Sequence, residues 1–243
     1  MIRHQLRDAG GNELEITMER LKGKWNIKVG GVNQHKKGYD SYFKAELFLK
    51  AVLRNTLNRG FSYHPGYRSI PAQSFLIITP QAVMRHLKQP GYVCQYIPKD
   101  QVRAVVSFIN GEIKIYPSGG GELVQAAKYI EPLRTLFGDW STDVVLEICV
   151  SHCSFEAGQR PLFTALDILQ YGDTVLASEI FLNRHTLLKK VTASTGLFRF
   201  GCFGAEDNDF ITPFAAVKEL EKVCILRHVE ETRRGERMKV LFR

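Results

Sequence analysis

The chain has 243 residues, 44% of them hydrophobic, which is enough to bury a core of ordinary size and to form a small second domain. Lys and Arg outnumber Asp and Glu by 33 to 25, and the resulting net charge of +8 favours a polyanionic partner, with a plain solvated basic surface as the alternative. No apolar run approaches the roughly 20 residues of a membrane span, and the first residues lack the apolar segment of a signal peptide. We therefore expect an intracellular protein without membrane contacts.

The five cysteines are scattered and odd in number, which predicts buried, reduced thiols rather than disulfides. Cys149, His152 and Cys153 are the one group in which metal-ligand residue types lie close together. A zinc site needs a second pair of ligands at a suitable spacing, and the sequence offers none. We therefore predict no metal site.

Residues 1–63 are predicted to form a small sheet-and-helix unit. Apolar residues alternate over residues 14–18 and 24–29, which is typical of strands, and an amphipathic helix is predicted from about Ser41 to a stop at Gly60. This order resembles a WGR domain, in which a short sheet precedes a helix that ends in a Gly-aromatic pair, here Gly60-Phe61. The Trp-Gly-Arg strand start of that family is replaced by Val29-Gly30-Gly31, so an arginine that could contact nucleic acid is absent.

A domain boundary is predicted between residues 63 and 70, where Tyr, His, Pro, Gly and Ser follow one another without periodicity. Beyond it, a short strand at residues 74–79 precedes a helix at residues 81–88. Residues 91–123 then form a central hairpin, because Asn110-Gly111 suits a two-residue type I′ turn between two apolar-alternating runs. We expect residues 94–109 and 112–116 to pair as antiparallel strands.

The rest of the chain alternates helices with short buried strands. Helices are predicted at residues 123–137, 178–191 and 213–222, and strands at residues 143–150, 163–169, 223–226 and 238–242. Two of these strands carry one carboxylate each, Glu147 and Asp167, and a carboxylate in a core strand needs a partner or a function. The expected fold class is therefore α+β, with antiparallel sheets, flanking helices and the small N-terminal unit.

In this order, residues 70–243 resemble the nucleotidyltransferase domain of ATP-dependent DNA ligases, without the OB domain that follows it in most ligases. The family motif Lys-x-Asp-Gly-x-Arg falls on residues 98–103, where Asp100 and Arg103 match and Pro98 replaces the lysine. The motif Ser-Arg-x-Gly falls on residues 118–121, and the acidic motif of an apolar strand keeps Glu147. The resemblance implies a ligase-like domain joined to a WGR-like module.

Further matches follow the family order. Leu166 stands where the aromatic residue that stacks on adenine belongs, and the pattern Leu-x-x-Arg-x-x-Leu-Leu places Arg184. Near the end, Lys222 replaces a glutamate, and Lys239 begins a terminal Lys-x-Lys whose second lysine is Leu241 here. The resemblance thus implies a vestigial ATP pocket that includes Arg103, Glu147, Leu166 and Lys239.

The same alignment argues against the family's chemistry. The lysine amine of the first motif attacks the α-phosphate of ATP, and Pro98 carries no amine. Lys99 is the obvious substitute, but neighbouring side chains in a strand point to opposite faces, so only a bulge would aim it at the pocket. We therefore assign no catalytic role within the degenerate motif of Pro98, Lys99, Asp100 and Arg103, and no cofactor. We expect ATP and Mg²⁺ as cofactors only if the chain is active.

Basic residues crowd two segments that flank the active-site cleft in ligase-like domains. If they contact phosphates there, they form one continuous basic surface for nucleic acid, and DNA is expected rather than RNA. The predicted nucleic-acid-binding residues are Arg184, Lys189, Lys190, Arg227, Arg233, Arg234 and Arg237.

Three functions stay open at this point. The first is a catalytically inactive ligase-like protein that binds nucleic acid or acts as a scaffold, together with other proteins of a complex. The second is an active nucleotidyltransferase or polynucleotide ligase that uses Lys99 or a residue of a partner, and the third is a structural subunit of a larger assembly. For the ligase-like fold we expect Glu147 and Asp167 to face the same cleft as Asp100, and the repulsion among them to raise at least one pKa.

Overall fold

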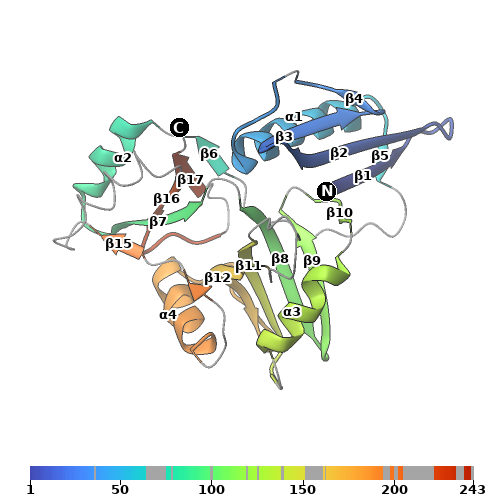
Figure 1. The fold of residues 1–243 in the computed structure, drawn as a ribbon. Helices are drawn as coiled ribbons and strands as arrows, with labels where there is room; N and C mark the ends of the chain where they lie inside the picture. The colour runs from blue at the N-terminus through green and yellow to red at the C-terminus, as the bar shows by residue number, and fades with distance from the viewer. Residues whose placement is uncertain are drawn as a thin grey trace.

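The computed structural model describes most of the chain as an α+β protein with three sheets and, among the described residues, four helices. Figure 1 shows the three sheets side by side with helices against them, and its element labels are used below. The described residues are 1–35, 37–63, 75–77, 79–98, 101–118, 120–124, 126–137, 140–150, 161, 163–193, 198–199, 202–204, 222–233 and 238–241.

The first sheet combines the N-terminal strands with one strand from the middle of the chain. Its order is β10-β1-β2-β3-β4, with β5 also paired to β1. Its strands are β1 (Ile2–Arg7), β2 (Glu13–Leu21), β3 (Lys24–Val29), β4 (Val32–Asn33), β5 (Ser62–Tyr63) and β10 (Glu122–Leu123). The predicted alternation is confirmed, because Ile16, Met18, Trp25 and Ile27 are all buried on one side of the sheet, which helix α1 (Tyr42–Asn58) covers (Figure 1).

Helix α1 begins one residue after Ser41, as predicted. Its apolar stripe packs on that sheet. Phe43 and Leu49 are fully buried, and Leu53 is nearly so. The helix ends before Gly60, whose φ of +92° is the left-handed conformation that a glycine adopts at low cost after a helix. The predicted strands and helix are therefore present, while a separate unit of residues 1–63 and its boundary at residues 63–70 stay predictions, because the boundary lies almost wholly outside the described residues.

Strand β10 corrects one sequence-based expectation. Leu123 was predicted to begin a helix, but it pairs with Ile2 at the edge of the first sheet, and helix α3 (Ala127–Phe137) begins four residues later. The apolar spacing predicted a helix that includes Leu123, but Leu123 is buried as part of an edge strand and not on a helix face. The segment that follows the central hairpin thus adds a strand to the N-terminal sheet.

The second sheet has the order β13-β12-β11-β8-β9 and is built around the central hairpin. Asn110 and Gly111 have φ angles of 52° and 74°, so the predicted type I′ turn is confirmed. Helix α3 packs against β9, and the ring of its Phe137 also stacks 5.7 Å from that of Phe108 in the neighbouring strand β8. The strands are β8 (Val102–Ile109), β9 (Glu112–Pro117), β11 (Val144–Val150), β12 (Phe163–Tyr171) and β13 (Thr174–Val175), and β14 (Phe198–Arg199) runs parallel to β12.

The third sheet has the order β15-β7-β16-β17-β6, and it corrects the expected extent of the hairpin. Residues 94–109 do not form one strand, because β7 pairs with β16 in this sheet while β8 belongs to the second sheet. Its strands are β6 (Phe75–Ile77), β7 (Tyr92–Pro98), β15 (Cys202–Gly204), β16 (Lys222–His228) and β17 (Met238–Leu241).

Two more helices flank these sheets. Helix α2 (Pro80–Leu87) begins as predicted, because the side chain of Thr79 accepts a hydrogen bond from the backbone N–H of Ala82 and caps the helix. Helix α4 (Phe181–Val191) packs against β12. The helix predicted at residues 213–222 lies outside the described residues except for Lys222, which is in β16. No described helix has the length and apolar character needed to cross a membrane.

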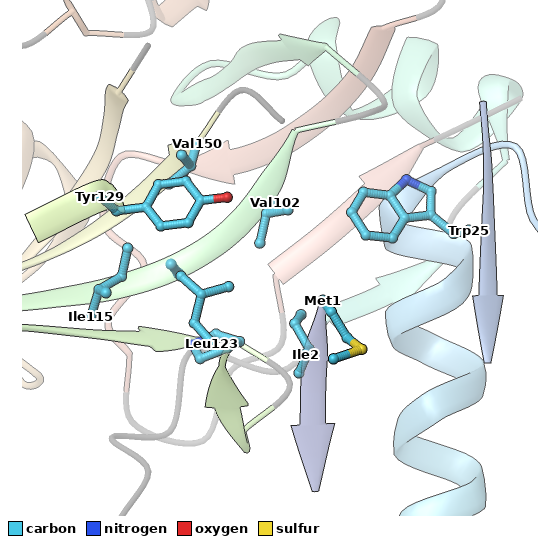
Figure 2. A pocket seen from close by; sticks show the side chains of 10 residues that line it. Met1, Ile2, Trp25, Val102, Ile115, Leu123, Tyr129 and Val150 are labelled. Carbon is cyan, nitrogen blue, oxygen red and sulfur yellow. The ribbon is translucent and has the colours of Figure 1, made fainter. Parts of the chain in front are cut away.

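Figure 2 shows where the first two sheets meet. Met1, Ile2 and Trp25 of the first sheet face Val102 of β8 and Tyr129 of α3 around an apolar cavity of about 10 Å³. A space of that size holds about one water molecule, so it is a packing defect rather than a ligand site. One hydrophobic core runs through this junction. Within the described side chains, Cys94 and Cys149 are buried, as predicted.

Candidate functional site

The two core carboxylates lie side by side in the second sheet. Glu147 of β11 and Asp167 of β12 are direct cross-strand partners, and both side chains are fully buried. Side chains directly opposite each other in an antiparallel pair project to the same face. The two carboxylates lie on neighbouring strands and share one face, as predicted, whereas the cleft that they were expected to share with Asp100 stays a prediction, because Asp100 and Lys99 lie outside the described residues.

Arg103 of β8 approaches Glu147 from the neighbouring strand. Its Nε donates to Glu147 Oε1 at 2.9 Å, and its Nη2 makes a second, shorter contact with the same oxygen. Its Nη1 lies 3.5 Å from Glu46 Oε1 of helix α1. Glu46 also accepts a hydrogen bond from the hydroxyl of Ser118 at 2.8 Å and forms an ion pair with Lys50 at 2.7 Å. Arg103 matches the arginine of the family motif, and here its guanidinium group is ion-paired with two carboxylates of the same chain.

Arg233, which follows β16, bridges the two core carboxylates. Its Nη1 lies 2.7 Å from Glu147 Oε2 and 3.1 Å from Asp167 Oδ2. Arg184 of α4 binds Asp167 with two hydrogen bonds of 3.0 and 3.1 Å. Arg227 of β16 lies 3.8 Å from Asp167 and 2.9 Å from Glu231.

These contacts form one continuous arginine–carboxylate network, which as described contains four arginines and four carboxylates. Each of these arginines therefore contacts at least one carboxylate, and Lys50 adds a further cation at the edge of the network through Glu46. Fully buried charges are stable only when they are paired and hydrogen-bonded in this way. The network consists of Glu46, Arg103, Glu147, Asp167, Arg184, Arg227, Glu231 and Arg233.

For Glu147 and Asp167 the expectation of a raised pKa is wrong, while Asp100, the third carboxylate of that expectation, lies outside the described residues. Burial by itself would raise the pKa of Glu147, but Arg103 and then Arg233 outweigh it and hold that pKa well below its ordinary value. Burial also opposes ionisation of Asp167, whose pKa is nevertheless lowered by Arg227, Arg184 and Arg233. The expectation considered repulsion between neighbouring carboxylates and did not include the arginines, which come from distant parts of the sequence.

The structure also contradicts the predicted basic surface for nucleic acid at three of its arginines. Arg184 and Arg227 are 1% and 0% exposed, and the side chain of Arg233 is 8% exposed. Because all three are ion-paired inside the protein, they do not form the predicted phosphate-binding surface. Lys189 and Lys190 are exposed near the end of α4. Arg234 and Arg237 lie outside the described residues, as does the side chain of Lys239, whose backbone is in β17.

The remaining pocket residues are placed as follows. Leu166 is fully buried in the hydrophobic core, and its backbone carbonyl accepts a hydrogen bond from the Gln95 side chain at 3.2 Å. Pro98 ends β7, and its Cα partner across the sheet is Lys222 of β16. Within the described part of the chain, no group of three His, Cys, Asp or Glu side chains could hold a metal ion.

Sequence reasoning missed Glu46, although the sequence carries a signal for it. The residue falls in the buried stripe of α1, between Tyr42 and Leu49, at a spacing that an apolar residue would normally occupy. A carboxylate at such a position requires a buried partner. The Tyr42 hydroxyl reaches the same place, 3.3 Å from both the Arg103 carbonyl oxygen and the Ser118 hydroxyl.

Comparison with known proteins identifies the fold. No protein-family model matches the chain, and no curated protein sequence matches it. Among solved structures, a mycobacterial DNA ligase D complexed with ATP and MES matches with 18% identity and a TM-score of 0.50, over 62% of this chain and 54% of that one. A protein titled Pmar-Lig_Pre matches with 12% identity and a TM-score of 0.50, over 79% of this chain and 50% of that one.

The chain has a ligase-like nucleotidyltransferase fold. The resemblance drawn from its motifs is confirmed at the level of the fold, and so is the α+β class with antiparallel sheets. This ligase-like chain spans about half the length of the solved structures that it matches. The resemblance of residues 1–63 to a WGR module stays a prediction.

Proposed function

We propose that this ligase-like protein is catalytically inactive and serves as a nucleic-acid-binding or scaffolding component. The observation that carries the proposal is the position of Arg233, whose guanidinium group bridges Glu147 and Asp167 at 2.7 and 3.1 Å. The ligase resemblance assigns Glu147 to the nucleotide pocket, and Asp167 directly follows Leu166, another residue assigned to that pocket. Their charge is already balanced inside the protein.

The residues present do not fit a magnesium–nucleotide complex. A divalent cation requires carboxylate oxygens that are free to coordinate it, and here the carboxylates are hydrogen-bonded to arginines. Displacing the arginines would leave buried cations without partners, which typically costs several kcal/mol. The absence of an amine at Pro98 supports the same conclusion, because a lysine-linked adenylate cannot form there.

Nucleic acid is the proposed partner because a ligase-like fold is combined with a net charge of +8. Phosphate contacts of this kind position a protein without reading bases, so we propose binding with little sequence preference. DNA is proposed rather than RNA, and other proteins of a complex are compatible with the scaffolding role.

The activity test is covalent labelling. After incubation of the purified chain with ATP and either Mg²⁺ or Mn²⁺, mass spectrometry is expected to detect no AMP adduct, and a nicked duplex is expected to stay unsealed. An adduct would favour the active alternative. Lys99→Ala and Lys222→Ala variants would then locate it, since Lys222 is the cross-strand partner of Pro98. Absence of both adduct and nucleic-acid binding would favour a purely structural subunit instead.

A further inference from the structure

The positive charge of the protein is concentrated in its first quarter. Residues 1–63 contain 12 Lys and Arg against 6 Asp and Glu, a net charge of +6, whereas residues 64–243 contain 21 against 19, a net charge of +2. Four arginines of the second part are also held inside the arginine–carboxylate network. The electrostatic field that attracts a polyanion therefore originates mainly from the N-terminal sheet and helix.

Three lysines gather at one end of that sheet. Lys22 and Lys24 belong to the tight turn between β2 and β3, where Lys22 and Gly23 have φ angles of 49° and 74°, and both lysines are exposed. Lys37, also exposed, lies in the loop between β4 and α1. A Cβ atom added to the adjacent Gly38 would lie only 2.9 Å from Lys24 Cβ, so this loop packs directly against the end of β3. We call Lys22, Lys24 and Lys37 the lysine cluster.

The lysine cluster is fixed in place by the backbone. Trp25 and Tyr39 exchange two hydrogen bonds of 2.7 Å, which attach the loop to β3, and Trp25 itself is buried. Positive charges on a rigid framework lose less entropy when they bind than charges on a mobile segment do. The backbone thus holds the three lysines where they can contact one ligand at the same time.

The other described lysines of residues 1–63 form ion pairs, in contrast to the lysine cluster as far as the structure describes it. Lys28 is paired with Glu19, Lys44 with Asp40 at 3.2 Å, and Lys50 with Glu46 at 2.7 Å. Within the described part of the chain, none of the three cluster lysines forms an ion pair. Their full charge is therefore available to a partner.

We propose that the lysine cluster is the surface through which this protein contacts the phosphates of nucleic acid. The inference rests on the proposed function and specifies where its binding takes place. Lysine ammonium groups act as flexible point charges toward phosphates, which suits contacts that tolerate any sequence. The lysine cluster takes the role that the sequence predicted for Arg184, Arg227 and Arg233, which the structure places in internal ion pairs.

The test uses a fluorescent DNA duplex and anisotropy titrations of the full chain from about 50 to 200 mM KCl. The lysine-cluster variant combines Lys22→Ala, Lys24→Ala and Lys37→Ala, and it is expected to bind the duplex at least about tenfold more weakly. The slope of the logarithm of the binding constant against the logarithm of the salt concentration is expected to become shallower by about 2.7, or about 0.9 for each lysine. A control variant, Arg85→Ala, Lys88→Ala, Lys128→Ala, removes the same charge from exposed positions elsewhere and is expected to lower the slope much less.

Equal losses in the two triple variants would overturn the inference, because net charge alone would then explain binding. Unchanged binding in the lysine-cluster variant would overturn it while leaving the proposed function intact, whereas no binding by the unmodified chain would overturn both. Anionic vesicles containing phosphatidylserine serve as competitor. If they displace the duplex and their own binding requires the lysine cluster, the partner is a membrane surface and the inference is wrong. Because all substituted residues are exposed, circular dichroism should show the same folded state in each variant.

Discussion

Glu147 depends on two arginines that reach it from different parts of the chain, Arg103 in β8 and Arg233 after β16. At 0% exposure the carboxylate has no water to stabilise its charge, so both guanidinium groups are needed to keep it ionised. The same argument applies in reverse to Arg103, whose buried charge depends on Glu147 and Glu46.

Replacing Glu147 with glutamine should therefore destabilise the protein strongly. The amide keeps the size of the side chain but leaves Arg103 and Arg233 buried with an unbalanced charge, so we expect the free energy of unfolding to fall by about 3–5 kcal/mol in urea denaturation. The matched control is Glu112→Gln, an exposed glutamate paired with Lys114 at 3.0 Å, which should change stability by less than about 1 kcal/mol. Similar small effects at both positions would show that the network contributes little to stability.

At the scale of elements, the hairpin of β8 and β9 is determined by its turn. Gly111 adopts a φ of 74°, and a Cβ atom added there would meet no other atom within 4 Å. A substitution at this position therefore tests backbone conformation alone, without any steric overlap. Local residue preference and observed structure agree fully here.

The variant Gly111→Ala should lower the free energy of unfolding by about 1 kcal/mol, because alanine is strained at positive φ. Gly111→Asn should cost clearly less, since asparagine tolerates the left-handed region better than other residues do. Thermal and urea denaturation of the two variants would measure the difference. Equal losses would mean that the turn does not keep its type I′ geometry in solution.

At the scale of the whole molecule, acid should destabilise the protein in two stages. His4 of β1 is fully buried next to Tyr63, both its ring nitrogens lack a partner among the described residues, and burial lowers its pKa to about 4. Its pKa in the unfolded chain is about 6.5, so the unfolded state binds the extra proton first. The stability that neutral His4 provides is complete above pH about 6.5 and is lost as the pH falls toward 4, by up to about 3 kcal/mol.

The second stage comes from Glu147 and Asp167. Their pKa values are lowered in the folded state, so their contribution is present above pH about 4 and is lost as the pH falls further. Urea denaturation between about pH 7 and 4 should show the first stage. The variant His4→Leu should remove the dependence in that window, and a pH profile identical to that of the unmodified chain would contradict this assignment to His4.

The sequence by itself determined the type of most described elements, the turn at Asn110-Gly111 and the ligase-like fold, because periodicity and turn chemistry act between near neighbours and the order of the motifs was preserved. It did not determine the pairing of distant segments, such as the separation of β7 and β8 into different sheets or the joining of β10 to β1. Only the tertiary structure decided that Arg184, Arg227 and Arg233 are internal ion-pair partners. Arg233 is 86 residues from Glu147, and whether a charge is solvated or paired depends on what folding brings beside it.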